Sequence, residues 1–214
     1  MGSTSYIDDS LRSFLVKLGG RSPEPAGGAA LALAGASAAA LVSLTCHAGL
    51  GDSDLGAEHE ALRACQVRSA DLSERIQKLI DQDVHAYRAV LQALRMPQAT
   101  DDQRRARQTS LDDALARASE VPLEVARASL EILALAVRLE PSVRPVVVGD
   151  LAASVHLAEA AIRGSLRNAR VNAGAMVDAS RAQTIIQAAE DLGREANRHA
   201  SLAHQALGDR GLPG

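Results

Sequence analysis

Two aspartates inside one predicted helix are the first candidates for acid–base chemistry. Asp81 and Asp83 are followed by Ala86 and Tyr87, in a stretch whose apolar residues recur at helical spacing. Asp83 and Tyr87 are four residues apart, so they share one helix face with apolar side chains. A carboxylate that faces the interior of a helical bundle has a raised pKa, which suits a general acid or base. The alternative interpretation is an exposed acid on the rim of the bundle.

A segment rich in proline and glycine precedes another predicted helix. Pro23 and Pro25 alternate with other residues and lead into Gly27 and Gly28. Glycines at a helix start expose backbone N–H groups at the positive end of the helix dipole, which favours an anion or a polar ring edge. The same glycines would also let two helices pack closely without any ligand. Both interpretations stay open at this point.

A second aspartate of interest, Asp150, follows Gly149 after a proline-containing linker. The position predicts the start of a helix, where Asp commonly serves as the N-terminal cap. Asp150 is therefore either an ordinary helix cap or a second functional carboxylate.

Other familiar chemistries find no support in the sequence. The six histidines are scattered, no Glu-x-x-His pair is present, and His199 and His204 are five residues apart rather than four. There is no G-x-S-x-G segment and no phosphate-binding P-loop. Cys46 and Cys65 offer neither a disulfide framework nor metal-ligand spacing. We therefore expect no metal ion and no prosthetic group.

Composition predicts an all-α protein in a reducing compartment. Alanine and leucine dominate the apolar residues, and Tyr6, Phe14 and Tyr87 are the aromatic residues, a balance that favours helix over strand. The net charge of −3 does not favour nucleic acid or an anionic membrane as a partner. Residues 1–12 lack the apolar core of a signal peptide, and two cysteines fit the cytoplasm. We expect a cytoplasmic protein.

The stretch 25–51 contains no charged residue, yet its centre is mostly alanine. Alanine gains little free energy from transfer into lipid, so we interpret this stretch as the buried central helix of a bundle and expect no membrane span. The predicted helices cover 7–18, 25–51, 52–96, 100–137, 150–167 and 173–207.

Local signals define the ends of these helices. Ser5 with Asp8 predicts a cap for the first helix, Asp52 to Asp54 a start for the third, and Thr100 with Gln103 a capping box for the fourth. Pro122 is expected to kink or restart the fourth helix, and the polar run 168–172 to break the fifth. We expect one domain over 1–214, with its core at about 5–207.

Taken in order, five segments resemble the cyclodeaminase/cyclohydrolase family. Its members are the cyclodeaminase half of formiminotransferase-cyclodeaminase and the bacterial methenyltetrahydrofolate cyclohydrolases. The resemblance covers about residues 5–207. Ser22–Ala29 is similar to the family's S-P-T-P-G-G-G-S, Asp83–Tyr87 to D-x-x-A-[FY], and Ala118–Leu123 to A-x-x-V-P-L. Gly149-Asp150 is similar to the family's Ser-Asp, and Asn168–Asn172 to N-V-x-x-N.

The resemblance implies a helical homodimer with a tetrahydrofolate derivative as substrate. It implies either cyclisation of 5-formiminotetrahydrofolate to 5,10-methenyltetrahydrofolate with release of ammonia, or hydrolysis of 5,10-methenyltetrahydrofolate to 10-formyltetrahydrofolate. Positioned carboxylates can move the protons that both reactions require. The catalytic candidates are Asp83 and Asp150, with either one as the acid, in one cleft. The substrate-binding candidates are Pro25, Gly27, Gly28, Tyr87 and Asn172.

The sequence departs from the family pattern at several positions. Ala26 and Ala29 replace a glycine and a serine, residues 47–52 replace a stretch that bears Lys or Tyr, and Gly149 stands where the family has Ser. Most of these changes remove a side chain that could hydrogen-bond substrate. The alternative function is therefore a non-catalytic or repurposed helical dimer of the same fold that binds a small molecule or a protein partner.

Overall fold

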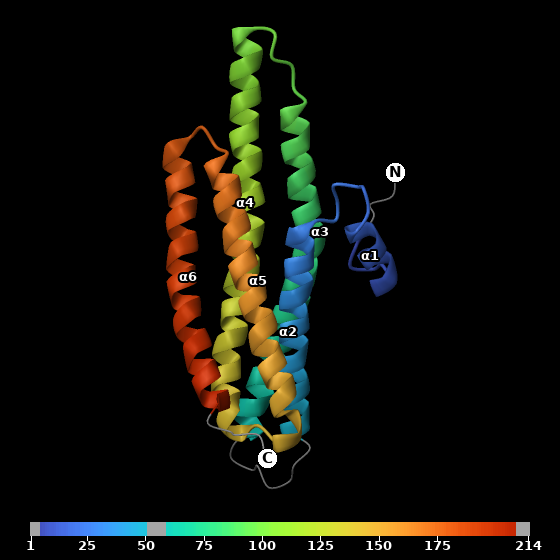
Figure 1. Cartoon of the computed structure of the whole chain (residues 1–214), viewed down its shortest axis with the longest axis vertical. Coiled ribbons are helices and arrows are strands. Elements are labelled where there is room, and N and C mark those ends of the chain that lie inside the picture. The colour runs from blue at the N-terminus through green and yellow to red at the C-terminus, as the bar shows by residue number, and fades with distance from the viewer. Residues whose placement is uncertain (1–4, 51–58, 209–214) are drawn as a thin grey trace.

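The computed structural model describes residues 5–50 and 59–208. These residues form α-helices and short 3₁₀ turns, and no strand occurs among them, so the predicted all-α fold is confirmed. Five long helices run side by side along one axis, and the short α1 lies outside them (Figure 1). The elements are α1 Leu11–Leu18, α2 Gly27–Leu50, α3 His59–Leu94, α4 Asp101–Leu139, η2 Glu140–Ser142, η3 Pro145–Val147, α5 Val148–Gly174 and α6 Ala179–Gly208.

The alanine-rich helix α2 is the centre of the bundle, as predicted. It packs against α3, α4 and α5, and the side chains of Ala29, Ala32 and Ala38 are fully buried. A Cβ atom at Gly35 would lie 2.9 Å from the Oγ atom of Ser129 in α4, so the two helices approach closely there. By length and composition, α2 and the segment 145–174 could each cross a membrane, but both pack within this bundle.

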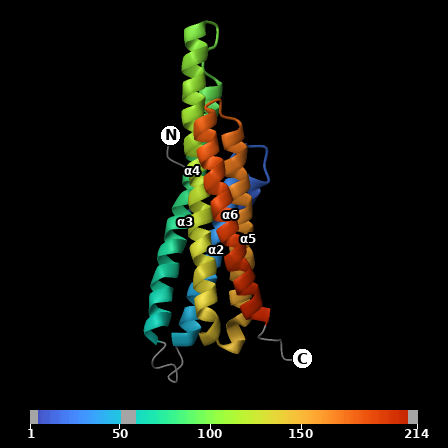
Figure 2. The same ribbon diagram turned by 90° about the vertical axis from the view of Figure 1, so that its left-hand side faces the viewer.

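Helices α3 and α4 form a hairpin whose turn extends beyond the ends of the other helices (Figures 1 and 2). The predicted capping box begins α4: Thr100 Oγ1 accepts a hydrogen bond from the Gln103 backbone N–H at 3.2 Å, and Gln103 Oε1 accepts one from Thr100 N at 3.3 Å. The helix does not restart at Pro122, because α4 continues through this residue as one helix.

The expected break at residues 168–172 is wrong, because α5 continues to Gly174. Ala169 is fully buried, and Asn172 donates a hydrogen bond to the carbonyl oxygen of Ala118 in α4. These contacts hold the polar run in helical form. The turn into α6 is instead held by Asp112, whose carboxylate accepts hydrogen bonds from the backbone N–H groups of residues 177 and 178.

The first helix begins later than predicted, at Leu11, and Ser10 is its cap. Ser5 does not cap it: the Ser5 hydroxyl and the Tyr6 N–H both donate hydrogen bonds to Asp81, at 2.8 Å and 2.6 Å. The carboxylate of Asp81 therefore ties the N-terminal segment to α3. The predicted helix start at 52–54 lies outside the described residues.

Candidate active site

The carboxylate of Asp83 lies against the first turn of α2. A Cβ atom built on Gly28 would be 2.0 Å from the Oδ1 atom of Asp83, a distance that no real side chain tolerates. Gly28 is therefore required for the close approach of α2 to this carboxylate. A Cβ atom on Gly27, by contrast, would meet nothing within 4 Å.

Burial raises the pKa of Asp83 from 3.8 to about 6, and a hydrogen bond from the backbone of Ala29 lowers it by a smaller amount. Ala29 lies in the first turn of α2, where backbone N–H groups have no partner within the helix. The loss of hydration is thus the stronger effect. With a pKa near 6, Asp83 is mainly ionised at pH 7 and can still take up a proton readily, as a general base must.

Asp83 faces a cleft of about 270 Å³ between the N-terminal end of α2 and the helices α3, α4 and α5. Its walls are mainly apolar, and among the residues that line it Asp83 is the one carboxylate. None of the lining residues is Lys, Arg, His or Cys. The lining comprises Ala26, Gly27, Gly28, Asp83, Tyr87, Val90, Ala118, Pro122, Asn168, Val171 and Asn172.

Five of the predicted site residues meet in this cleft: Gly27, Gly28, Asp83, Tyr87 and Asn172. The Tyr87 side chain is 37% exposed, and the Asn172 amide donates to the carbonyl oxygen of Ala118 at 2.8 Å. That hydrogen bond fixes the Asn172 side chain, whose amide oxygen remains as an acceptor. The cleft thus combines one partly buried carboxylate with a few neutral polar groups.

A comparison with known families identifies the chain. The formiminotransferase-cyclodeaminase family model matches residues 10–191. The chain belongs to this family.

Two named relatives are similar to this chain over most of its length. The chain is 31% identical over 189 residues to the methenyltetrahydrofolate cyclohydrolase of Methylorubrum extorquens. The aligned residues make up 88% of this chain and 91% of that protein. The chain is 28% identical over 174 residues to the formimidoyltransferase-cyclodeaminase of Mus musculus. The aligned residues make up 81% of this chain but 32% of that protein. The chain therefore spans about a third of the mouse relative.

The fold is also similar to a solved structure. The formiminotetrahydrofolate cyclodeaminase of Thermotoga maritima superposes with a TM-score of 0.85 at 18% sequence identity, covering 94% of this chain and 97% of that chain. At this identity the likeness concerns the fold, and it matches the helical architecture expected for the family.

Two predicted site residues of this family member lie away from the cleft. Pro25 is fully buried and is not among the residues that line the cleft, so its assignment to substrate binding stays a prediction. It precedes the first turn of α2. The neighbouring Glu24 forms a bidentate ion pair with Arg88 on α3, with N–O distances of 2.6–2.8 Å, and so fixes the segment that leads into Gly27.

Asp150 is not near Asp83 in the same chain. It lies in the first turn of α5, whereas Asn172 of the cleft lies near the last. At 1.5 Å per residue these two positions are about 33 Å apart. The expectation that both aspartates line one cleft is therefore wrong within a single chain. Asp150 is not the predicted N-cap either, because the cap residue is Val147.

The sequence pattern also missed several lining residues. Ala118 and Pro122 come from α4, and Asn168 lies one helical turn before Asn172 on α5. All three belong to segments on which the family resemblance depends. The spacing of Asn168 and Asn172, four residues apart, was the signal that could have placed both on one face.

Proposed function

We propose that the protein is a one-carbon folate enzyme that hydrolyses 5,10-methenyltetrahydrofolate to 10-formyltetrahydrofolate in the cleft at Asp83. The observation that carries this proposal is the single ionisable carboxylate in an apolar cleft. The similarity to a cyclohydrolase over nearly the full length of both chains supports the choice of reaction.

The charge of the cleft suits this substrate. The methenyl carbon lies between two nitrogens that share one positive charge. A carboxylate in surroundings of low dielectric attracts such a cation more strongly than the same carboxylate in water. The apolar lining around Asp83 therefore favours binding of the amidinium group beside the carboxylate.

The same carboxylate can move the protons of the reaction. Asp83 accepts a proton from water as the oxygen attacks the methenyl carbon, which forms a tetrahedral carbon between N5 and N10. The protonated Asp83 then donates that proton to N5 while the bond from the carbon to N5 breaks. Loss of the remaining hydroxyl proton to solvent leaves the formyl group on N10. A positioned acid–base group of this kind contributes about 10²–10⁴-fold to a rate.

The second candidate is the cyclodeaminase reaction, which the similarity to the formimidoyltransferase-cyclodeaminase of Mus musculus favours. N10 would attack the formimino carbon on N5, and ammonia would leave with a proton. The reaction uses the same carbon and similar proton transfers, so Asp83 would serve both. A repurposed binding protein without catalysis remains the alternative, since Ala26 and Ala29 lack hydrogen-bonding side chains.

The test follows the absorbance of 5,10-methenyltetrahydrofolate with purified protein. We expect decay of the added compound to exceed the spontaneous rate, and Asp83→Asn to abolish the excess. Appearance of the absorbance from 5-formiminotetrahydrofolate would instead assign the cyclodeaminase reaction. Absence of both activities in a folded protein would contradict the proposal and favour the repurposed binding protein.

We further propose a cytoplasmic homodimer without nucleic-acid or membrane partners. The free, buried Cys46 and Cys65 fit a reducing compartment. On α1, Leu11, Leu15 and Val16 are more than half exposed and offer an apolar surface for a second copy. Light scattering is expected to give twice the chain mass of 22.3 kDa, and a monomer at micromolar concentration would contradict the dimer.

A further inference from the structure

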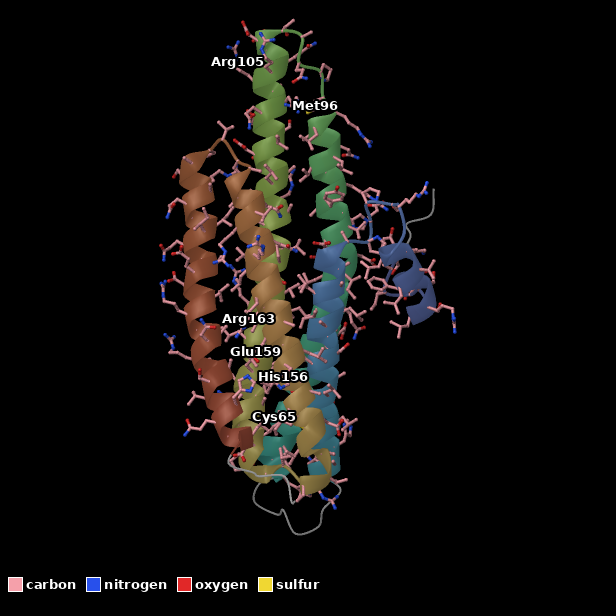
Figure 3. The ribbon with its side chains drawn as sticks, in the orientation of Figure 1. Cys65, Met96, Arg105, His156, Glu159 and Arg163 are labelled. Carbon is pink, nitrogen blue, oxygen red and sulfur yellow. The ribbon has the colours of Figure 1, made fainter. Side chains whose placement is uncertain are left out.

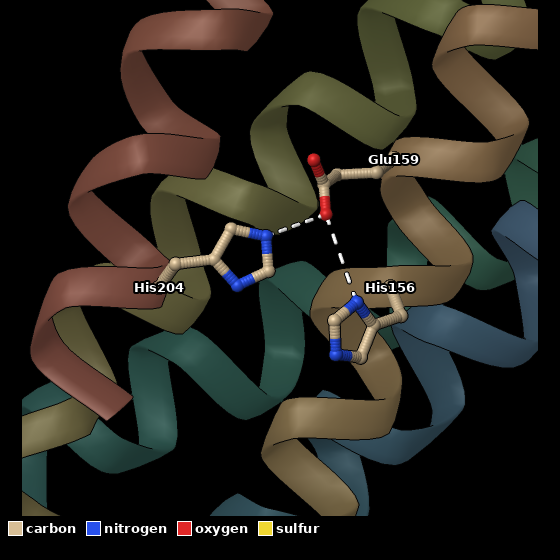
Figure 4. A group of neighbouring side chains, drawn as sticks. All are labelled: His156, Glu159 and His204. Carbon is tan, nitrogen blue, oxygen red and sulfur yellow. Dashed lines mark hydrogen bonds and ion pairs between the residues drawn. The ribbon is translucent and has the colours of Figure 1, made fainter. Parts of the chain in front are cut away.

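Two histidines and one glutamate from different helices meet on the surface of the bundle, far from the cleft. His156 and Glu159 lie one turn apart on α5, and His204 reaches them from α6 (Figures 3 and 4). One ligand atom from each residue lies within 4.8 Å of the other two. His204 Nε2 is 2.7 Å and His156 Nδ1 3.8 Å from the same Oε2 atom of Glu159.

These separations are close to those of a metal site. Four ligands at about 2.0–2.2 Å from a tetrahedral Zn²⁺ lie about 3.3–3.6 Å from one another. The two contacts to Glu159 fall on either side of this value, so small side-chain rotations would bring all three atoms to bonding distance. Two imidazoles and a carboxylate form a ligand set that favours zinc and similar transition metals over Ca²⁺ or Mg²⁺.

The surroundings hold the carboxylate in place and leave the site open. The second oxygen of Glu159 accepts a hydrogen bond from Arg163 Nη2 at 3.1 Å. This contact orients Glu159, although the charge of Arg163 also weakens the attraction for a cation. The Glu159 side chain is 14% exposed, whereas those of His156 and His204 are 68% and 42% exposed. An ion therefore has direct access from solvent, and a fourth position is left for water.

An ion pair of His204 with Glu159 accounts for one of these contacts and an i, i+3 pair of His156 with Glu159 for the other, but neither pair alone brings both rings to the same oxygen. The His156 and His204 rings have their centroids 5.1 Å apart, and Nδ1 of His156 is directed at the same oxygen (Figure 4). Two imidazole nitrogens and one carboxylate oxygen thus converge on one point.

We propose that His156, Glu159 and His204 bind a divalent transition metal of the Zn²⁺ class. The ion would link α6 to α5. Glu159 and Asn172 are thirteen positions apart on α5, which is about 20 Å along the helix. The metal site is therefore distinct from the Asp83 cleft, and it is independent of the proposed function.

The spacing of the histidines along the chain gave no indication of this site. We expected no metal, because no two histidines have the spacing of a zinc pair on one helix. His204 lies 45 residues after Glu159 and reaches it through the antiparallel packing of α5 and α6. His156 and Glu159 alone, at i and i+3, are too common a pair to indicate a ligand set.

The test is a titration of the full chain, free of any affinity tag, with Zn²⁺ alone in competition with a chromophoric chelator. We expect one Zn²⁺ per chain, and at least about tenfold weaker binding in each of His156→Ala, Glu159→Gln and His204→Ala. The matched control is His85→Ala, which removes an exposed histidine on α3 and should leave the affinity unchanged. Equal affinity in the wild type and all three ligand variants would overturn the proposal, as would absence of binding.

A second measurement separates a loss of metal binding from a loss of folding. Zn²⁺ should raise the melting temperature of the wild type and of His85→Ala but not that of His204→Ala, because a bound ion stabilises the form that binds it. Circular dichroism checks that each variant is helical, and His156 is exposed enough that its replacement should not disturb the fold. A melting temperature that rises equally in His204→Ala would contradict a site that joins α5 and α6.

Discussion

At the scale of single residues, Gly28 and Asp83 have to be considered together. The carboxylate occupies the volume in which a side chain at position 28 would begin, so the glycine sets how closely Asp83 approaches the first turn of α2. That approach places the carboxylate between two opposing effects, the loss of hydration and the hydrogen bond from Ala29. The result is a group that titrates close to neutral pH, which is the range useful for acid–base catalysis.

Gly28→Ala is expected to lower kcat/KM by at least about tenfold, because a 1 Å displacement of a catalytic group has effects of this size or larger. The new methyl group would overlap the Asp83 carboxylate and move it. Gly149→Ala is the matched control, since its methyl group would meet nothing within 4 Å and the position lies at the start of α5, away from the cleft. We expect that control to keep the rate within about threefold, well inside one power of ten. Similar losses in both variants would contradict the role assigned to Gly28.

Asp83→Asn is expected to stabilise the fold above pH 7. The pKa of Asp83 is about 6 in the folded chain against an ordinary 3.8, so the folded chain holds this proton more tightly than the unfolded chain. The stability of the wild type therefore falls as pH rises from about 4 through 6, by about 2–3 kcal/mol from this group. Asn carries no such penalty. Urea unfolding of both proteins at pH 4 and pH 7.5 should show the advantage of Asn at pH 7.5 shrinking at pH 4, and a pH-independent difference would contradict the buried carboxylate.

Much of this cleft could be predicted from residue types, and the errors have physical causes. The spacing of Asp83 and Tyr87 places both on one helix face, and Gly27 and Gly28 lie at the start of another helix. One contact between these two helices is enough to bring the four residues together. Pro25 was assigned to the substrate because it belongs to the same motif, and its burial could not be predicted from that motif. Asp150 was assigned to the site from its motif alone. The motif does not show that Asp150 lies at the opposite end of α5 from Asn172.

At the scale of elements, α2 explains why the bundle can form such a narrow site. Its small side chains let α3, α4 and α5 surround it closely, so that its N-terminal end lies against α3 and α4 at the cleft. The predicted identity of α2 as the buried central helix followed from its lack of charge. The errors in the neighbouring helices arose where tertiary contacts override local signals. Asn172 holds α5 to α4 through a run that looked like a break.

Ala38→Leu is expected to destabilise the protein by about 1–3 kcal/mol, because the added atoms have no space in the fully buried contact around α2. Ala40→Leu is the matched control on the same helix, at an exposed position, and should change stability by less than about 0.5 kcal/mol. Chemical unfolding measures both. A well-tolerated leucine at position 38 would show that α2 is packed loosely rather than tightly.

At the scale of the whole molecule, the two aspartates of the family pattern lie toward opposite ends of the bundle. Asp83 lies with Asn172 near the end of α5, and Asp150 lies at its start. In its own chain Asp150 is a first-turn carboxylate, which stabilises a helix by about 0.3–1 kcal/mol through the helix dipole. The proposed catalysis at Asp83 therefore does not require Asp150 of the same chain.

Asp150→Asn is accordingly expected to keep kcat/KM within about twofold of the wild type, a barrier change of about 0.4 kcal/mol. A loss as large as that of Asp83→Asn would mean that a second copy brings its Asp150 to the cleft. Mixing the two inactive variants would then restore part of the activity through mixed dimers. That recovery would contradict a site formed by one chain.

The most direct test of the central claim is kcat/KM toward 5,10-methenyltetrahydrofolate at pH 7.5 for the wild type, Asp83→Asn and Asp71→Asn. Asp71 is an exposed aspartate on the same helix and serves as the matched control. We predict a loss of at least about 100-fold in Asp83→Asn and a change within about twofold in Asp71→Asn. A folded Asp83→Asn protein with the wild-type rate would contradict the assignment and place the chemistry outside this cleft.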